Sequence, residues 1–305
     1  MVFDHIGCNP IILQYDYEKP YAGLELLKMT NLIELIENRF GTETDVSQNV
    51  ETTSLTGDVL ARRSFRRYLE REVPENLRNL LLACAQSASS KSDLQQYSII
   101  DIQEQSTKDE LAELSGSPFM IEAPVVLIFC GDTHRGQRIS ELRGFPYAQN
   151  TLENFMNAAV DAALAMQTYI LAAESHGLGC CPVSHVRNDL EQIRDLLHLP
   201  EGVFPMAGLT AGWPGEERDV TLRLPPSVVV HKNTYNDKTL KEEIDIYDRR
   251  RHEKRPIPAS SYLLSEEFDL PDFYGWSEHI ARRLSRPNGL EGLKPFLKSH
   301  GFKLE

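Results

Sequence analysis

The chain has 305 residues, 41% of them hydrophobic and 25% charged, and its formal net charge is -13 with an isoelectric point near 5.2. This composition is typical of a globular protein with ample apolar material for a core. The acidic balance argues against a general nucleic-acid binder and against adhesion to anionic lipid, because both usually need a basic surface.

No segment is expected to cross a membrane or to direct secretion. The most apolar long stretch, 158–173, is interrupted by Asp161 and Gln167 and is shorter than the roughly 20 residues that a span needs. The first ten residues lack the charged-then-apolar pattern of a signal peptide. The five cysteines form no CxxC pair and no Cys/His ligand spacing, so we expect reduced thiols, a cytoplasmic location and no metal site.

Three regions are expected along the chain. Residues 1–58 form an N-terminal extension, in which helical spacing of apolar residues over 20–41 predicts one helix and the turn-rich stretch 41–58 predicts a polar linker. Residues 59–236 form the core. Residues 237–305 form a C-terminal extension of helices and loops, with a helical segment at 276–287.

Helices and strands mix in the core without a regular βαβ order. A helix is expected after Pro74, a suitable first-turn residue. Its apolar stripe would consist of Leu77, Leu80, Leu81 and Cys84. The later predicted elements are strands at 97–102 and 123–130, a long helix at 151–176, a strand at 180–183, a helix capped by Asn188 and a strand at 204–213. This order predicts an α+β fold with a sheet packed by long helices.

An unusual run of arginines occurs in ARRSFRRYLEREVP, residues 61–74. Its members are Arg62, Arg63, Arg66, Arg67 and Arg71. Guanidinium groups suit phosphate or carboxylate, and so do the hydroxyls and amides of SASSKSDLQQ (87–96) and the arginine of RLPP (223–226). Taken singly, however, such segments are more often a solvated helix face, a surface loop and a turn. Hydrolytic triad motifs, Walker loops and a complete dinucleotide-binding glycine pattern are absent from the sequence.

The order of these segments resembles the FMN-dependent nitroreductase family, in particular the branch of oxygen-insensitive NADPH nitroreductases and related flavin reductases. The similarity covers residues 60–236 and returns in WSEHIARRL (276–284) and KPFLKSHGF (294–302). Its main segments are RRSFRRY (62–68), SASSKSDLQQYSII (87–100), AAESHGLGCCPVSHVRNDLEQIRDLLHLP (172–200), AGLTAGWPGE (207–216) and RLPPSVVVHKNTY (223–235).

The resemblance implies a central mixed sheet in an intertwined homodimer, with one FMN in each of two pockets at the subunit interface. The RxSxR segment would open the first core helix and hold the FMN phosphate together with Arg223, while Arg67 and Arg71 would pair with neighbouring acids. A loop of the partner subunit and the residues after the 180–183 strand would contact the flavin. The residues implied to bind FMN are Arg62, Arg63, Ser64, Arg66, Ser89, Ser90, Lys91, Pro182, Val183, Ser184, His185 and Arg223.

The implied activity is a ping-pong reaction that carries two electrons from NAD(P)H to a small acceptor, such as a nitroaromatic or a quinone. It requires no catalytic side chain, and none is assigned. Flavin reduction for a partner, reductive dehalogenation and flavin fragmentation are alternatives on the same fold, and a non-enzymatic FMN-binding protein is a further one.

The chain also departs from the family pattern. Ser184 and His185 stand where close relatives have two glycines, and Thr221 stands where a lysine is expected, which removes one charge from the phosphate site. The N-terminal extension lies outside the pattern. The resemblance implies a loop between about 249 and 275, which is longer than in close relatives and lies where NADPH is usually recognised. Its Arg249–Arg251 run would either contact a 2'-phosphate of NADPH or form a solvated charge run.

Overall fold

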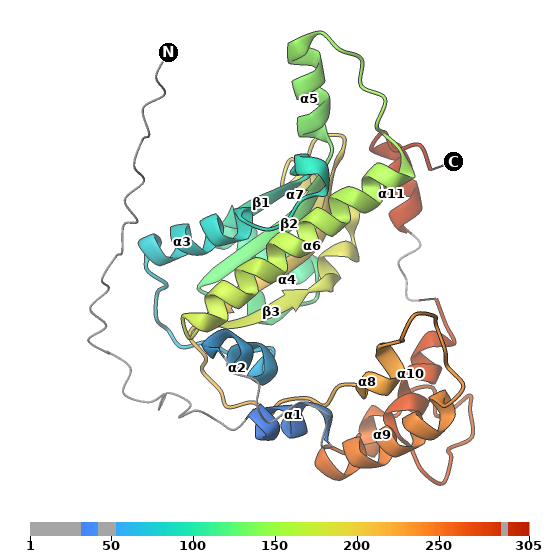
Figure 1. The fold of residues 1–305 in the computed structure, drawn as a ribbon. Helices are drawn as coiled ribbons and strands as arrows, with labels where there is room; N and C mark the ends of the chain where they lie inside the picture. The colour runs from blue at the N-terminus through green and yellow to red at the C-terminus, as the bar shows by residue number, and fades with distance from the viewer. Residues whose placement is uncertain (1–31, 42–52, 288–291, 305) are drawn as a thin grey trace, which may run out of the picture.

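The computed structural model describes residues 32–41, 53–287 and 292–304 (Figure 1). Its centre is a sheet in the order β1-β2-β4-β3. The strands are β1 (Tyr97–Ile102), β2 (Val125–Asp132), β3 (Gly179–Val183) and β4 (Val203–Gly212). All three ladders are antiparallel. The sheet was expected to be mixed, but its three ladders are all antiparallel. In the described ranges, parallel pairing occurs in isolated bridges.

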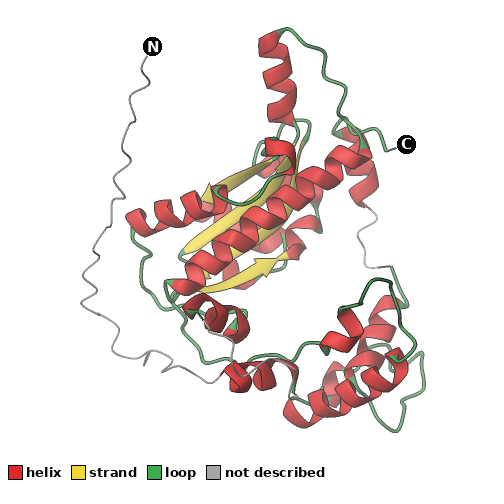
Figure 2. Cartoon of the chain, viewed as in Figure 1, coloured by secondary structure: helices red, strands yellow, loops and turns green. Residues whose placement is uncertain are grey.

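Helices cover both faces of the sheet, as Figure 2 shows in red around the yellow strands. One face carries α3 (Glu75–Gln86) and the long α6 (Leu152–Ser175), and the other carries α4 (Gln105–Leu114) and α7 (Leu190–Leu196). The central strand β2 alternates between the two cores: Leu127 and Phe129 pack beneath α6, while Val126 and Ile128 pack toward α4 and α7. This alternation is the two-residue period of a strand that is buried on both faces.

The terminal regions lie beside this core (Figure 1). The N-terminal helices are α1 (Leu32–Phe40) and α2 (Ser54–Ala61), and α5 (His134–Arg143) projects from the end of β2. The C-terminal helices are α8 (Pro226–Val229), α9 (Leu240–Lys254), α10 (Trp276–Leu284) and α11 (Leu293–Ser299). The last of them returns to the core, where Phe296 packs with Phe204.

The predicted strands at 97–102, 123–130, 180–183 and 204–213 and the long helix at 151–176 are confirmed within a few residues. Other predictions are wrong in detail. The linker prediction fails at 54–58, which belong to α2, while residues 42–52 of that linker and the helical stretch 20–31 fall outside the described residues. Helix α7 is capped by Asp189 instead of Asn188, because the Asp189 carboxylate accepts the Gln192 N–H.

Two further differences concern the candidate site. The RRSFR segment does not open a helix: it follows α2, and α3 begins only at Glu75. The region from 249 is helical as far as Lys254, because it belongs to α9. None of the helices in the described ranges is long and apolar enough to cross a bilayer.

Candidate functional site

The RRSFR segment runs along the outer edge of β3. Ser64 forms an isolated parallel bridge with Cys180, and the Phe65 N–H donates to the Cys180 carbonyl at 3.1 Å. The Phe65 ring is buried against Gly179, where a Cβ atom would lie 2.5 Å from a ring carbon. A glycine at 179 therefore admits the ring, and the buried ring fixes the main chain that carries the neighbouring arginines.

Two arginines of this segment meet two others from distant parts of the chain. We call Arg39, Arg62, Arg63 and Arg223 the arginine cluster. The pKa of Arg39 is lowered to about 10, chiefly by burial and then by the positive charges of Arg223, Arg62 and Arg63 in that order. The Arg223 N–H also donates to the Arg39 carbonyl at 2.8 Å. The fold therefore concentrates positive charge at one point of an acidic chain.

Glu174, in the last turn of α6, is the carboxylate that faces this cluster. Its Oε1 lies 3.4 Å from Arg62 Nε. Burial raises the pKa of Glu174 to about 7, although the charges of Arg62 and Arg63 act in the opposite direction. The carboxyl group thus titrates near neutral pH and gives the arginine cluster only part of a counter-charge.

Several buried donors in the cluster lack a hydrogen-bond partner among the described residues. They are Nη2 of Arg62, Nε of Arg63 and Nε of Arg62, the last of which faces Glu174 Oε1 in the ion pair at 3.4 Å. Buried polar groups are nearly always paired, because an unsatisfied donor costs about 1–3 kcal/mol. An anion with several oxygens, such as a phosphate, would satisfy these donors and balance the excess charge.

Arg66 and Ser64, also predicted to hold the phosphate, occupy different surroundings. The Arg66 guanidinium lies beside the Cys181 thiol, whose pKa is raised by burial and lowered by Arg66, and 5.9 Å from the Phe119 ring centroid. Ser64 is held by its bridge to Cys180. The structure therefore brings Arg62, Arg63 and Arg223 together and places the Arg66 guanidinium beside Cys181.

The predicted flavin-ring segment continues along β3 past Cys181. Pro182, Ser184 and His185 are exposed, while Val183 is buried in the core between the sheet and α4. Ser184 and His185 begin a short 3-10 turn that ends at Arg187. The edge of the sheet formed by β3 is therefore lined by Arg62, by Arg66 and by the exposed side chains of this segment.

The predicted loop residues Ser89, Ser90 and Lys91 lie elsewhere in the chain. Buried Asp161 of α6 anchors their loop, since its carboxylate accepts the Ser90 hydroxyl at 2.9 Å and the Lys91 N–H at 3.0 Å. Asp161 and Glu174 are about 20 Å apart along the helix axis. Within one chain, these three residues are not brought to the arginine cluster.

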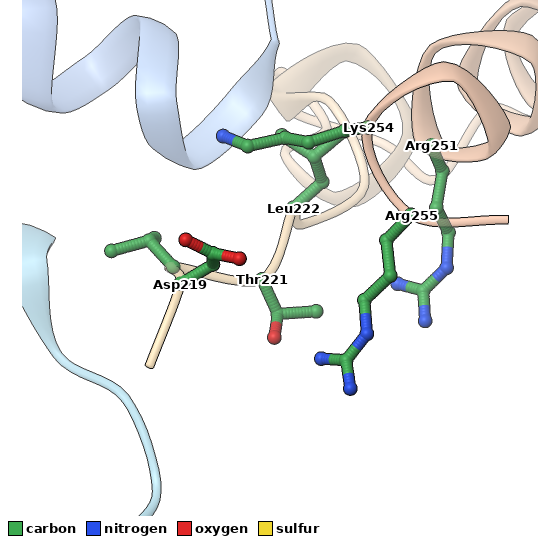
Figure 3. A pocket seen from close by; sticks show the side chains of 7 residues that line it. Asp219, Thr221, Leu222, Arg251, Lys254 and Arg255 are labelled. Atoms are coloured by element: carbon green, nitrogen blue, oxygen red, sulfur yellow. The ribbon is translucent and has the colours of Figure 1, made fainter. Parts of the chain in front are cut away.

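A shallow pocket lies next to the arginine cluster, between the segment before Arg223 and the end of α9 (Figure 3). It is lined by Asp219, Val220, Thr221, Leu222, Arg251, Lys254 and Arg255. Figure 3 shows the guanidinium groups of Arg251 and Arg255 pointing the same way beside Thr221. Of the Arg249–Arg251 run, Arg251 alone lines this pocket.

Sequence reasoning missed Arg39, Glu174 and Asp161. Arg39 was hidden in an extension outside the family pattern, and Glu174 and Asp161 read as ordinary residues of a long helix. A local signal existed for Glu174, which lies inside the matched segment AAESHGLGCC. In the described ranges, no group of three His, Cys, Asp or Glu side chains could hold a metal ion.

Comparison with known proteins adds an independent line of evidence. A model described as the Nitroreductase family matches residues 102–213, and one described as the Nitroreductase family, C-terminal domain, matches residues 222–305.

Two curated proteins and one solved structure are similar over most of the chain. The FMN reductase (NAD(P)H) of Bacillus subtilis is 33% identical over 250 residues, which cover 80% of this chain and 95% of that protein. The oxygen-insensitive NADPH nitroreductase of Salmonella typhimurium is 34% identical over 237 residues, which cover 77% of this chain and 90% of that protein. The structure of NfrA2 from B. megaterium gives a TM-score of 0.74 at 30% identity and covers 83% of this chain and 100% of that one.

Proposed function

The chain belongs to the nitroreductase family, and we propose on this basis that it is an FMN-dependent NAD(P)H oxidoreductase. It reduces small acceptors such as nitroaromatics, quinones or flavins by two electrons in a ping-pong reaction. The proposal rests on the arginine cluster and its buried donors without hydrogen-bond partners. FMN ends in a phosphate, whose negative charge would balance the cluster and whose oxygens would accept hydrogen bonds from these donors.

Arg62, Arg63 and Arg223 would hold the phosphate, and the residues from Pro182 to His185 would border the flavin ring. Bound FMN supplies the hydride-accepting and two-electron chemistry. The chain contributes position and charge: the arginines fix one end of the cofactor, and the sheet edge beside Cys181 offers exposed groups for the other. Ser64 and Arg66, between the two regions, would contact the intervening part of the cofactor.

The proposed enzyme is a homodimer with shared sites. Exposed apolar residues at four-residue spacing form a stripe on α6, which we call the α6 stripe. Its members Leu152, Met156, Val160 and Leu164 are 51%, 62%, 50% and 41% exposed. A second copy would remove this apolar surface from water. It would also bring Ser89, Ser90 and Lys91 to the arginine cluster of its partner, which they do not reach in their own chain.

A cytoplasmic location fits the described cysteines. Cys84, Cys130, Cys180 and Cys181 are all free thiols. Free, mostly buried thiols are typical of proteins from reducing compartments. The proposed partners are a second copy of the chain and a small electron acceptor, with neither nucleic acid nor membrane.

Anaerobic reduction tests the proposed function. The purified chain, reconstituted with FMN, is mixed with NADPH or NADH without oxygen, and the visible flavin absorbance is followed. We expect bleaching within the mixing time or seconds, and recovery of the yellow colour when a nitroaromatic or quinone is added. Flavin that stays yellow with both donors would identify a non-enzymatic FMN-binding protein. Three further reactions separate the nitroreductase from the other flavin reactions of this fold. Free FMN as the acceptor tests flavin reduction for a partner, and a halogenated aromatic tests reductive dehalogenation. Reduced flavin without any other acceptor tests flavin fragmentation.

A further inference from the structure

Helix α1 lies before both ranges that the family models match, yet it is packed into the candidate site. Leu35 and Ile36 are buried on one face of the helix. Lys254 of α9 donates to the Asn38 carbonyl at 3.1 Å. Figure 1 shows α1 between α2 and α9. Helix α1 is therefore part of the structure around the arginine cluster.

The Arg39 side chain joins the two segments that carry the other arginines. Its Nε and Nη2 atoms donate to the Leu60 carbonyl at 3.0 and 2.6 Å, and Nη2 also donates to the carbonyl of Arg62. Its Nη1 atom donates to the Thr221 carbonyl at 3.2 Å. The Arg39 main chain accepts from Arg223. One guanidinium thus fixes the spacing between residues 60–62 and residues 221–223.

This position is electrostatically unfavourable without a ligand. Arg39 is 6% exposed, and three other guanidinium groups act on it. Among the described residues it forms no ion pair, and Glu174 is the opposite charge that acts on it. Burying a cation among like charges costs stability unless an anion compensates. A neutral side chain with several N–H donors could also bridge these carbonyl oxygens. The buried positive charge of Arg39 therefore indicates that the residue also stabilises a bound anion.

We infer that Arg39 is a positioning residue of the phosphate site: it holds Arg62 and Arg223 at a fixed separation and adds a fourth positive charge. The charge that Thr221 does not provide is thus supplied from outside the family-matched ranges. This inference rests on the proposed function, which identifies the anion as the phosphate of FMN.

A comparison of FMN with riboflavin, which lacks the phosphate, tests the inference without measuring turnover. The chain is freed of flavin, and the dissociation constants of both ligands are measured by fluorescence titration for wild type, Arg39→Met and Arg39→Lys. We expect Arg39→Met to weaken FMN binding by about tenfold or more, since the variant loses both the fixed spacing of Arg62 and Arg223 and one of the four positive charges. Riboflavin binding should change by less than about twofold. Arg39→Lys keeps the charge but loses the forked geometry, so its FMN affinity should fall between the two.

Leu35→Ala is the matched control, because it loosens the packing of α1 without removing a charge. It should lower the melting temperature and leave the ratio of the FMN and riboflavin constants unchanged. Equal losses for both ligands in Arg39→Met, or no loss for either, would overturn the inference. If Arg39→Met does not fold, an unchanged ratio in Arg39→Lys overturns it instead. A wild-type chain that binds neither flavin would refute the proposed function itself, which separates that failure from failure of the inference alone.

Discussion

At the level of single residues, the charge balance of the arginine cluster depends on Glu174. Its carboxylate stands 3.4 Å from Arg62, but burial opposes its ionisation more strongly than the arginines favour it. The site therefore holds four guanidinium groups against a carboxyl group that is about half ionised near neutral pH. One more anion, such as a phosphate, would balance this excess of positive charge.

Replacing Glu174 with Gln should change the pH dependence of stability. The pKa of Glu174 rises from 4.5 to about 7 on folding. Between these values the unfolded chain has released this proton and the folded chain has kept it, so stability falls as pH rises through the window. A neutral amide escapes this loss. We expect the melting temperature of Glu174→Gln, relative to wild type, to rise between about pH 5 and pH 7 and to level off above. A difference that shrinks with rising pH would contradict the shift.

Replacing Arg62 with Ala should weaken FMN binding by about ten- to a hundredfold, because the buried Nη2 of Arg62 has no hydrogen-bond partner and a hydrogen bond from a charged group contributes about 1.5–3 kcal/mol. Arg71→Ala is the control from the same sequence run. The Arg71 guanidinium lies 4.0 Å from the Trp213 ring centroid, so its loss should affect stability more than affinity. Titration of both variants with FMN decides the point. Equal losses of FMN affinity in both variants would mean that the five arginines attract the phosphate by their summed charge, without specific contacts.

At the level of elements, α6 connects three parts of the proposed function. Its inner face packs on the sheet through small residues such as Ala162 and Ala165. Glu174 at its end faces the arginine cluster, and Asp161 in its middle anchors the loop at 87–96. Its outer face carries the α6 stripe. One helix thus relates the sheet, the two halves of a shared site and the surface for a second copy.

A charge placed on the α6 stripe should disrupt the proposed dimer. Val160→Glu would bury a carboxylate in the proposed interface, where an unpaired charge is strongly unfavourable. Light scattering should show the mass of a monomer, or a dissociation constant raised by at least about a hundredfold. Ser106→Glu adds the same charge to an exposed position of α4, on the opposite side of the sheet, and should leave the mass unchanged. A dimer that survives Val160→Glu would place the interface elsewhere.

At the level of the whole molecule, a shared site makes a prediction about mixed dimers. Arg62→Ala disables the arginine cluster of its own chain, and Lys91→Glu disables the loop that would serve the partner. In a mixed dimer, one site combines both changes and the other combines two intact parts. We therefore expect each variant alone to bind FMN weakly, and the purified mixed dimer to recover about one tight site out of two. No recovery would show that each chain builds its site alone.

The sequence alone predicted the strands and the long helix, and the comparisons confirm the family that the order of its motif segments indicated. These features are local. Periodicity along a strand or helix reports which side chains face the core, and a short motif keeps its residue types wherever it lies. The expectation that the RRSFR segment opens a helix came from the resemblance, and it is wrong because the segment pairs with Cys180 across the chain.

Only the tertiary structure decided the composition of the arginine cluster. Arg39, Arg62, Glu174 and Arg223 are far apart in the sequence, and their mutual charge effects depend on how α1, α6 and the segment before α8 pack together. The separation of the 87–96 loop from that cluster is likewise a property of the folded helix that anchors it. Electrostatic interaction depends on distance and burial in space, and neither is encoded by residue spacing along the chain.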